Sequence, residues 1–298
     1  MSETKKDKPL IIAGPCSAET EEQLLTIAHS LKKTTVDVFR AGIWKPRTRP
    51  GNFEGVGEIG LKWLKRVKEE TGLKTAIEVA NPKHVELALK NDVDVLWVGA
   101  RTTASPFTIQ EIANSCRGID NLVLVKNSIN ADLPLWIGAI ERFYGQNHTN
   151  LGAIHRGFSS FEKTKYRNIP IWEIPIGLRQ EFPDLPLIFD PSHIAGERSL
   201  IYELSKTAMA LNFNGLIIET HNDPDSAWSD SKQQVTPENL LSMLNDLLNK
   251  KEVLTLNPST EKLLELNFRL DTLKDQLGDV FIKKRKLIDQ VESKKIKK

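Results

Sequence analysis

The stretch Asn121-Leu122-Val123-Leu124-Val125-Lys126 shows the pattern that decides the fold, because it is a short apolar run that ends in a charged side chain. Such a run is typical of a strand buried on both faces of a sheet. Similar runs lie at Pro9–Gly14, Val36–Ala41, Lys74–Val79, Val93–Gly99, Asn121–Val125, Leu151–Ile154, Pro186–Phe189 and Gly215–Ile218. Between them the apolar residues have helical spacing. Strands that alternate with helices predict parallel pairing with right-handed crossovers.

Eight such units before residue 250 match the length of a (β/α)8 barrel, for which ~250 residues is typical. A doubly wound open sheet has the same alternation but uses only the strand ends near its switch point. Here nearly every run delivers a charged or metal-binding side chain at its carboxyl end. These side chains are Cys16, Arg40 with Lys45, Glu78, Arg101, Lys126, Arg156, Asp190 with His193, and Glu219 with His221. In a barrel they converge on one face, so we predict an α/β fold of the TIM-barrel type.

The composition is that of a globular protein, with 40% hydrophobic and 27% charged residues among 298. A net charge of +2 argues against nucleic acid as a partner. No apolar run reaches the ~20 residues that cross a membrane, and the polar N-terminus lacks a secretory signal. Two cysteines, Cys16 and Cys116, are too few for a disulfide framework. We therefore expect a cytoplasmic protein without a membrane partner, of a size that suits an enzyme.

The C-terminal part differs from the rest of the chain. We divide the sequence into a barrel over 1–250, a linker over 251–260 and an amphipathic helix over 261–298. Apolar residues recur in a 3-4 alternation at Leu263, Leu266, Leu270, Leu273, Leu277, Val280, Leu287 and Val291, with Lys284 as a polar exception. Because a single amphipathic helix has nothing to bury against, this seam predicts a partner helix.

Cationic side chains follow three consecutive strands, namely Arg101, Lys126 and Arg156. Cations gathered in one place repel one another unless an anion lies between them, so we expect a phosphate or carboxylate ligand. A second group follows the second strand, where Lys45-Pro46-Arg47-Thr48 lies just after Arg40. Proline stiffens this turn, and two cations with a hydroxyl predict a second phosphate site.

A thiol, an imidazole and two carboxylates form a further group: Cys16, His193, Glu219 and Asp230. They follow strands one, seven and eight, which are neighbours when a barrel closes. This ligand set suits one divalent transition metal, of the manganese, iron, cobalt or zinc class. By contrast, Gly55-Val56-Gly57-Glu58-Ile59-Gly60 only spells a dinucleotide-binding motif, because it does not directly follow a strand. The sequon Asn147-His148-Thr149 has no role without secretion.

From about Leu10 to Val235 the chain resembles the type I beta 3-deoxy-D-arabino-heptulosonate 7-phosphate (DAHP) synthases. The matching motifs are Ile12-Ala13-Gly14-Pro15-Cys16-Ser17, Lys45-Pro46-Arg47-Thr48, Gly99-Ala100-Arg101, Lys126, His155-Arg156-Gly157, Asp190-Pro191-Ser192-His193 and Ser229-Asp230. The resemblance implies a (β/α)8 barrel that condenses phosphoenolpyruvate with erythrose 4-phosphate at the start of the shikimate route. It also implies a homo-oligomer.

The resemblance assigns roles to the candidate residues. It places the metal on Cys16, His193, Glu219 and Asp230. It places phosphoenolpyruvate on Arg101, Lys126 and Arg156, with Arg40 and Lys45 nearby, and the sugar on Lys45, Pro46, Arg47 and Thr48. We count Lys45, Lys126 and His193 as the candidate catalytic residues. The group that handles the protons stays open between a metal-bound water, the surroundings of His193, and Glu78.

Three alternatives remain from the sequence. A sister family makes 3-deoxy-D-manno-octulosonate 8-phosphate from arabinose 5-phosphate, but it has an Ala-Asn-Arg-Ser type sequence where this chain has Lys45-Pro46-Arg47-Thr48. A Schiff-base aldolase would use Lys126 as its amine. A partner-binding protein with a decayed barrel would act through the seam over 263–291.

The tail resembles the first helix of the all-helical chorismate mutases over Leu266 to Lys295. Lys284 stands where that family has a catalytic arginine, and Lys295 matches a second lysine position. Asn267 replaces the arginine of the family's first turn, and no second or third helix follows. We therefore expect an incomplete domain without mutase activity.

Overall fold

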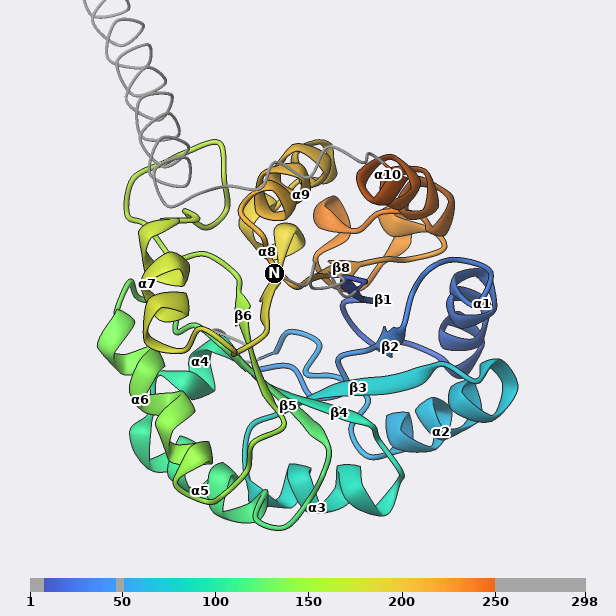
Figure 1. Ribbon diagram of the computed structural model, residues 1–298. Helices are drawn as coiled ribbons and strands as arrows, with labels where there is room; N and C mark the ends of the chain where they lie inside the picture. Colours follow the sequence, from blue (N-terminus) through green and yellow to red (C-terminus); the bar gives the residue numbers. More distant parts are fainter. Residues whose placement is uncertain (1–7, 47–50, 250–298) are drawn as a thin grey trace, which may run out of the picture. The chain divides into compact units, whose positions relative to one another are not determined.

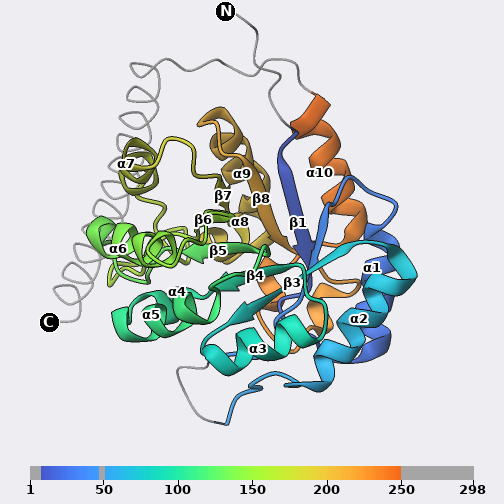
Figure 2. The ribbon, with the colours of Figure 1, turned by 60° about the horizontal axis from the view of Figure 1, so that its bottom comes forward.

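The strands form a closed parallel barrel in the order β1 to β8, with the helices outside it (Figures 1 and 2). The structure is a computed structural model, and it describes residues 8–46 and 51–249. The barrel closes because β1 pairs with β8 in parallel, from Leu10 opposite Gly215 to Gly14 opposite Glu219. The predicted (β/α)8 fold is confirmed, and the open sheet is excluded because its two edge strands would be unpaired.

Every predicted strand is present among the described residues, with shifts of one or two residues at its ends. The strands are β1 Leu10–Gly14, β2 Val38–Arg40, β3 Lys74–Val79, β4 Val95–Val98, β5 Leu122–Lys126, β6 Leu151–His155, β7 Leu187–Phe189 and β8 Gly215–Glu219. The largest differences are at β2 and β4, each three residues shorter than its predicted run. Both end residues of the run Val36–Ala41 are nevertheless buried, so the apolar pattern marks buried residues and not only residues paired in the strand.

Helices or helical turns follow each strand and cover the barrel. They are α1 Glu21–Leu31, α2 Ile59–Thr71, α3 Pro82–Lys90, α4 Ala100–Thr103, α5 Pro106–Ser115, α6 Leu133–Tyr144, α7 Glu173–Glu181, α8 Pro191–Ala195, α9 Ile201–Ala210 and α10 Pro237–Asn249. Side chains such as Thr20, Asn81 and Asp132 cap their first turns by accepting a backbone N–H. Contacts of α10 with α9 and α1 complete the ring.

The barrel interior is layered along its axis. An apolar layer is made of Ile12, Val38, Ala76, Val95, Trp97, Leu124, Ile154, Ile188 and Ile217. Alternate residues of a strand point to the same side, so the residue two positions further on also faces the interior, one layer nearer the carboxyl end. That next layer is made of Arg40, Glu78, Lys126, Arg156, Asp190 and Glu219. The same strands therefore carry both the core and a ring of charged groups above it.

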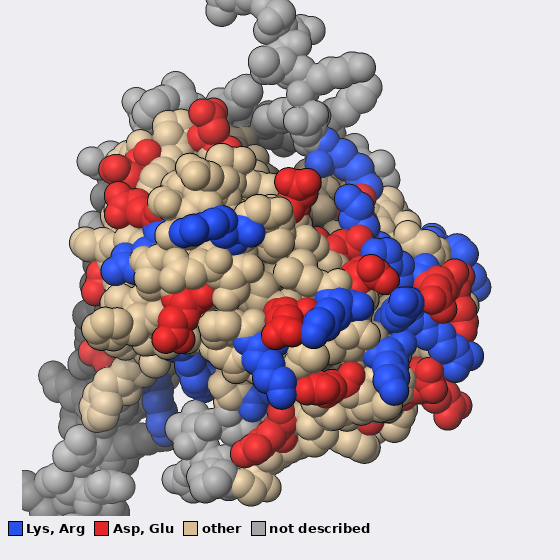
Figure 3. Space-filling model, turned by 90° about the horizontal axis from the view of Figure 1, so that it is seen from below, with Lys and Arg blue, Asp and Glu red and all other residues tan. Residues whose placement is uncertain are grey.

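The outer surface mixes both signs of charge. Figure 3 shows basic and acidic side chains interspersed over one face. Exposed ion pairs include Arg66–Glu70 within α2 and Lys65–Asp92.

In the described part of the chain, no helix has the length and apolar content to cross a membrane. The predicted linker over 251–260 and the helix over 261–298, with its mutase-like positions, lie outside the described residues, as do Arg47 and Thr48.

Candidate active site

A cavity of about 370 Å³ opens at the carboxyl ends of the strands, where the charged layer lies. Its lining residues are Lys45, Pro46, Asn52, Glu78, Ala100, Arg101, Lys126, Arg156, Arg167, His193 and Asp230. Seven of the predicted site residues are in this wall: Lys45, Pro46, Arg101, Lys126, Arg156, His193 and Asp230. The other three that the structure describes, Cys16, Arg40 and Glu219, are buried and contact this group. The wall is strongly cationic.

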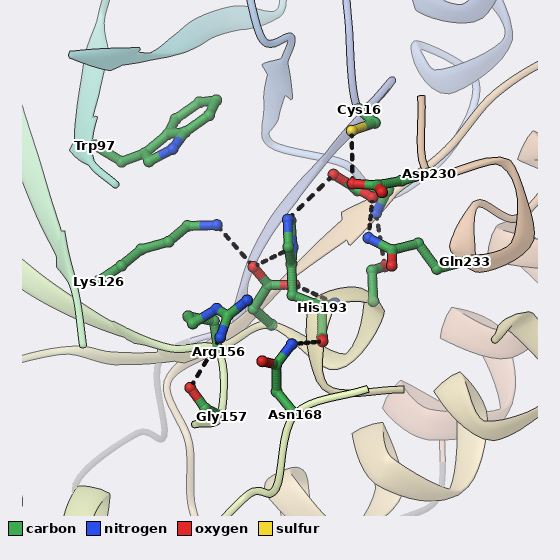
Figure 4. A network of polar contacts seen from close by, with 12 residues as sticks. Cys16, Trp97, Lys126, Arg156, Gly157, Asn168, His193, Asp230 and Gln233 are labelled. Atoms are coloured by element: carbon green, nitrogen blue, oxygen red, sulfur yellow. Dashed lines mark hydrogen bonds and ion pairs between the residues drawn. The ribbon is translucent and has the colours of Figure 1, made fainter. Parts of the chain in front are cut away.

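Cys16, Glu219 and Asp230 form a thiol–carboxylate cluster beside the cavity. One ligand atom from each lies within 4.8 Å of the other two, and the Cys16 Sγ is 3.3 Å from Asp230 Oδ2 (Figure 4). His193 approaches the cluster through Nε2, which is 3.7 Å from Glu219 Oε1. The structure thus brings three of the four predicted ligands into one group and places the imidazole at its edge.

Electrostatics decide the protonation of this cluster. Burial, together with the Glu219 charge, raises the pKa of the Cys16 thiol to about 12. Burial alone would raise the pKa of Glu219, but His193 and Arg40 outweigh it and hold that pKa below its ordinary value. Asp230 is similar, since Arg167 and His193 overcome the effect of burial and lower its pKa. Two carboxylates therefore face a protonated thiol.

The cluster fits the metal that the sequence predicts. Buried carboxylates repel each other, and a buried thiol resists ionisation, so the group gains from a cation between its members. A thiolate with carboxylate oxygens and a nearby imidazole suits a divalent transition metal. The donor chemistry is therefore consistent with such an ion.

Asp190 contacts and orients two of the predicted residues, a role that its position at a strand end did not predict. Its carboxylate lies 2.8 Å from Lys126 Nζ and 2.9 Å from His193 Nδ1. The neighbouring His193 and Lys126 more than offset the effect of burial and hold the pKa of Asp190 well below its ordinary value. Asp190 also caps α8 by accepting the His193 N–H at 3.1 Å. The Asp190-Pro191 pair is the sequence signal of that cap.

Arg156 lines the cationic wall, and Trp97 contacts two of the charged residues of the same layer. Burial lowers the pKa of Arg156 to about 10, which reflects a charge held away from water. Its backbone N–H donates to Asn127 Oδ1 at 2.7 Å, which fixes the end of β6. Trp97 lies below, with the Arg40 guanidinium 4.9 Å from its ring centre, and its Nε1–H donates to Glu78 Oε2 at 3.1 Å. Sequence reasoning treated Trp97 only as part of a strand.

The glycine-rich segment 55–60 has a structural role that the sequence did not predict. The Lys45 N–H donates to Glu54 O and the Gly57 N–H donates to Ile43 O, both at close range (2.8 and 2.9 Å). Gly55 has a φ of +97°, and a Cβ there would lie 2.2 Å from Ile43 O. The glycines let this segment approach the loop that carries Lys45. Lys45 Nζ in turn donates to Cys16 O at 2.8 Å. The exclusion of a dinucleotide motif agrees with this arrangement.

His155 belongs to the matching motif yet faces away from the cavity. It is fully buried among aromatic rings that include Trp172, Phe189 and Phe213, with ring centres 5.7–6.2 Å away. Burial lowers its pKa to about 3, so the imidazole is neutral. Because its neighbour Arg156 points inward, the alternation of the strand places His155 in the layer between barrel and helices.

Three further polar residues belong to the site but were not predicted from the sequence. Asn52 and Arg167 line the cavity, and Gln233 is buried beside the cluster. All three lie in irregular loops or short turns. No apolar periodicity marks such segments, so nothing in the pattern of strands and helices could have pointed to them.

The fold and the site together define a barrel protein whose carboxyl-end cavity joins a cationic wall to a thiol–carboxylate cluster. A sequence model of the DAHP synthetase I family matches residues 2–255. The chain belongs to this family.

Individual relatives fall into two named groups. The phospho-2-dehydro-3-deoxyheptonate aldolase of Thermotoga maritima is 34% identical over 241 residues, which cover 80% of this chain and 68% of that protein. The 2-dehydro-3-deoxyphosphooctonate aldolase of Wolinella succinogenes is 28% identical over 277 residues, covering 82% and 100%. The crystal structure of the Thermotoga maritima enzyme matches this fold with a TM-score of 0.72 at 31% identity, covering 80% of this chain and 68% of that one.

Proposed function

We propose that the chain condenses phosphoenolpyruvate with D-erythrose 4-phosphate and water, giving DAHP and phosphate in a metal-dependent reaction. This is the first step of the shikimate route to aromatic amino acids. The observation that carries the proposal is the cavity itself, in which five cationic side chains stand beside a buried thiol–carboxylate cluster. Two phosphorylated substrates, one of them also a carboxylate, require such an excess of cations. Membership of the DAHP synthetase I family supports the same conclusion.

Phosphoenolpyruvate is assigned to the wall formed by Arg101, Lys126 and Arg156. The guanidinium groups suit bidentate contacts with phosphate or carboxylate oxygens. Because Lys126 Nζ pairs with Asp190 and Arg156 Nη1 donates to Gly157 O at 3.2 Å, these two cations are held before the substrate arrives. Because these donors are already in place, they do not have to reorganise during the reaction. They would also align the enol carbon with the aldehyde.

The sugar phosphate is assigned to the turn that begins with Lys45 and Pro46 and continues through Arg47 and Thr48. Lys45 lines the cavity and also touches the cluster, with Nζ 3.0 Å from Cys16 Sγ. This contact supports a sugar site whose first residue, Lys45, lies next to the cluster. An aldehyde at the end of a bound erythrose 4-phosphate would then lie within reach of both the cluster and the enol carbon.

Cys16, Glu219 and Asp230, with His193, are the residues that would hold the divalent metal. A bound divalent ion would supply a Lewis acid for the aldehyde oxygen. Asp190 engages Nδ1 of His193, so the other ring nitrogen, Nε2, is left toward the cluster. Such an outer partner fixes the orientation of an imidazole ligand.

Glu78 is our candidate for moving a proton in the cavity. It lines the wall, and the Trp97 Nε1–H holds one of its oxygens, Oε2. The second oxygen is then available to a water or a substrate hydroxyl. His193 is the other candidate, since its ring also borders the cavity.

The alternative product, 3-deoxy-D-manno-octulosonate 8-phosphate, has support from the Wolinella succinogenes relative and its homologues. The turn at Lys45-Pro46-Arg47-Thr48 favours the four-carbon sugar. The Schiff-base aldolase has less support, because Lys126 Nζ is paired with Asp190 rather than presented as an amine. A homo-oligomer and a cytoplasmic location stay predictions.

The test follows the ultraviolet absorbance of phosphoenolpyruvate with erythrose 4-phosphate or arabinose 5-phosphate as co-substrate. We expect consumption with erythrose 4-phosphate only, its loss with a chelator and its return when a divalent metal is added. Preference for the five-carbon sugar would support the alternative product. Consumption that is insensitive to chelator, with a substrate adduct trapped by borohydride on Lys126, would support the aldolase. If phosphoenolpyruvate is not consumed with either sugar and any of the metals, the proposed enzyme function is wrong.

A further inference from the structure

Arg167 and Gln233 connect the two carboxylates of the cluster. Arg167 Nη1 donates to Asp230 Oδ1 at 2.9 Å and to Gln233 Oε1 at 2.6 Å. Gln233 Nε2 donates to Glu219 Oε2 at 2.6 Å. A single chain of hydrogen bonds therefore runs from Asp230 through Arg167 and Gln233 to Glu219, and Figure 4 shows Gln233 next to Asp230.

The chain of hydrogen bonds occupies one oxygen of each carboxylate, Asp230 Oδ1 and Glu219 Oε2. Asp230 Oδ2 is the oxygen that lies 3.3 Å from the Cys16 sulfur. Glu219 Oε1 is the oxygen that faces Arg40 at 2.8 Å and His193 at 3.7 Å. A hydrogen bond to one oxygen restricts the rotation of a carboxylate, and this favours one direction for the other oxygen.

Arg167 is itself held by the helix that carries His193. Its backbone N–H donates to Ala195 O at 3.2 Å, and Asn168 Nδ2 donates to His193 O at 2.6 Å. Gly196 ends α8 with a φ of +69°, and a Cβ there would lie 2.4 Å from Arg167 Cβ. The absence of a side chain at Gly196 thus allows the arginine stem to pack against the end of α8. Arg167 joins α8 to the loop after β8.

We propose that Arg167 and Gln233 are positioning residues that orient Glu219 and Asp230 toward one point between Cys16 and His193. Neither residue is a ligand, and their effect passes through the carboxylates. The inference rests on the proposed function, because Arg167 and Gln233 can position metal ligands only if the cluster binds a divalent metal. The competing role is direct: Arg167 also lines the cavity, where it could bind a substrate anion.

The test is a cobalt(II) titration of the metal-free protein. Absorbance of the thiolate-to-cobalt charge transfer reports the Cys16 bond, and competition with a chelator gives the affinity. In Arg167→Met and Gln233→Met we expect cobalt affinity to fall about 10- to 100-fold, as for other outer partners of metal ligands. Arg167→Lys keeps the charge and one donor, so it should recover part of the loss.

Arg198→Met is the matched control. Arg198 holds the same loop after β8 by donating to Ser231 O at 2.8 Å, and it pairs with the exposed Asp225. It makes no contact with either carboxylate of the cluster among the described residues. Its cobalt affinity should equal that of the parent chain. Thermal melting of each variant checks that all of them fold.

Each other outcome has its own meaning. Unchanged cobalt binding in both Met variants, with a raised KM for a substrate, would overturn the inference and make Arg167 a substrate ligand. An equal loss in Arg198→Met would overturn it in favour of general support of the loop. If the parent chain binds no cobalt, the metal site in the proposed function is itself wrong, and the inference falls with it.

Discussion

Two ion pairs are buried where the charged layer meets the cavity, Arg40–Glu219 and Lys126–Asp190. In each pair both side chains are 5% exposed or less. Removing one partner of a buried pair leaves a charge without compensation and costs about 3–5 kcal/mol. At the scale of single residues, the groups assigned to substrate and metal are therefore also needed to keep their neighbours stable, so loss of activity in their variants requires a check on folding.

The buried imidazole of His155 predicts how the free energy of unfolding depends on pH. Its pKa is about 3 in the folded chain against an ordinary 6.5, because burial disfavours the charged ring. Between those values the unfolded chain binds a proton that the folded chain does not, so stability falls as the pH falls. The slope reaches about 1.4 kcal/mol per pH unit. In His155→Phe we expect this contribution to disappear, as measured by urea unfolding between pH 7 and pH 4.

The control for His155 is Phe189→Leu, a change in the same aromatic group that adds and removes no titrating site. It should lower the unfolding free energy by a similar amount at every pH. If His155→Phe keeps the full acid dependence of the parent chain, the dependence arises from other groups, and the assignment to His155 is wrong.

At the scale of elements, the loop between β2 and α2 depends on backbone that only glycine fits well. Gly55→Ala would bring a Cβ to 2.2 Å from Ile43 O and push the chain that leads to Lys45. We expect the KM for erythrose 4-phosphate to rise roughly tenfold, equivalent to about 1.4 kcal/mol. Steady-state kinetics with each substrate varied in turn measures the effect, and the KM for phosphoenolpyruvate should change less.

Gly57→Ala is the matched control for Gly55→Ala. Gly57 has a similar left-handed φ of +72°, but a Cβ there would meet nothing within 4 Å. The variant carries the strain of a left-handed alanine, about 1–2 kcal/mol, without the collision. Equal changes in KM for the two variants would show that backbone strain, and not the collision with Ile43, disturbs the loop.

The same scale explains what the sequence could predict. Strands buried on both faces appear in the sequence as short apolar runs, so all eight strands could be predicted. The charged side chains at the ends of these runs could be predicted with them. Asp190 was noticed at a strand end, but its pairing with both Lys126 and His193 is a matter of three-dimensional packing. Arg167 and Gln233 lie in irregular segments whose path depends on contacts with α8 and β8. No local pattern encodes those contacts.

For the whole molecule, the cluster ties distant parts of the chain together. Cys16 follows the first strand, while Glu219 and Asp230 lie at and beyond the last. A ligand that binds only the folded form stabilises it by about 2.7 kcal/mol at a hundredfold excess over Kd. We therefore expect added divalent metal to raise the Tm of chelator-treated protein by roughly 4–5 °C, measured by calorimetry.

The two cysteines provide the control for this shift. Cys16→Ala removes the sulfur of the cluster and should abolish most of the metal-dependent rise in Tm. Cys116→Ala changes a buried thiol that lies just after α5, outside the cluster, so it should keep the rise. A rise that survives in Cys16→Ala would show that the metal stabilises the chain from another place.

The apolar layer beneath the charged ring has a consequence for how substrates arrive. Ile12, Leu124 and Ile217 fill the barrel and keep water out from below, so the space behind the cations polarises poorly. Field lines from Arg101, Lys126 and Arg156 then leave mainly through the open mouth. The cavity therefore attracts anions from solution, most strongly when little salt is present to screen its charges.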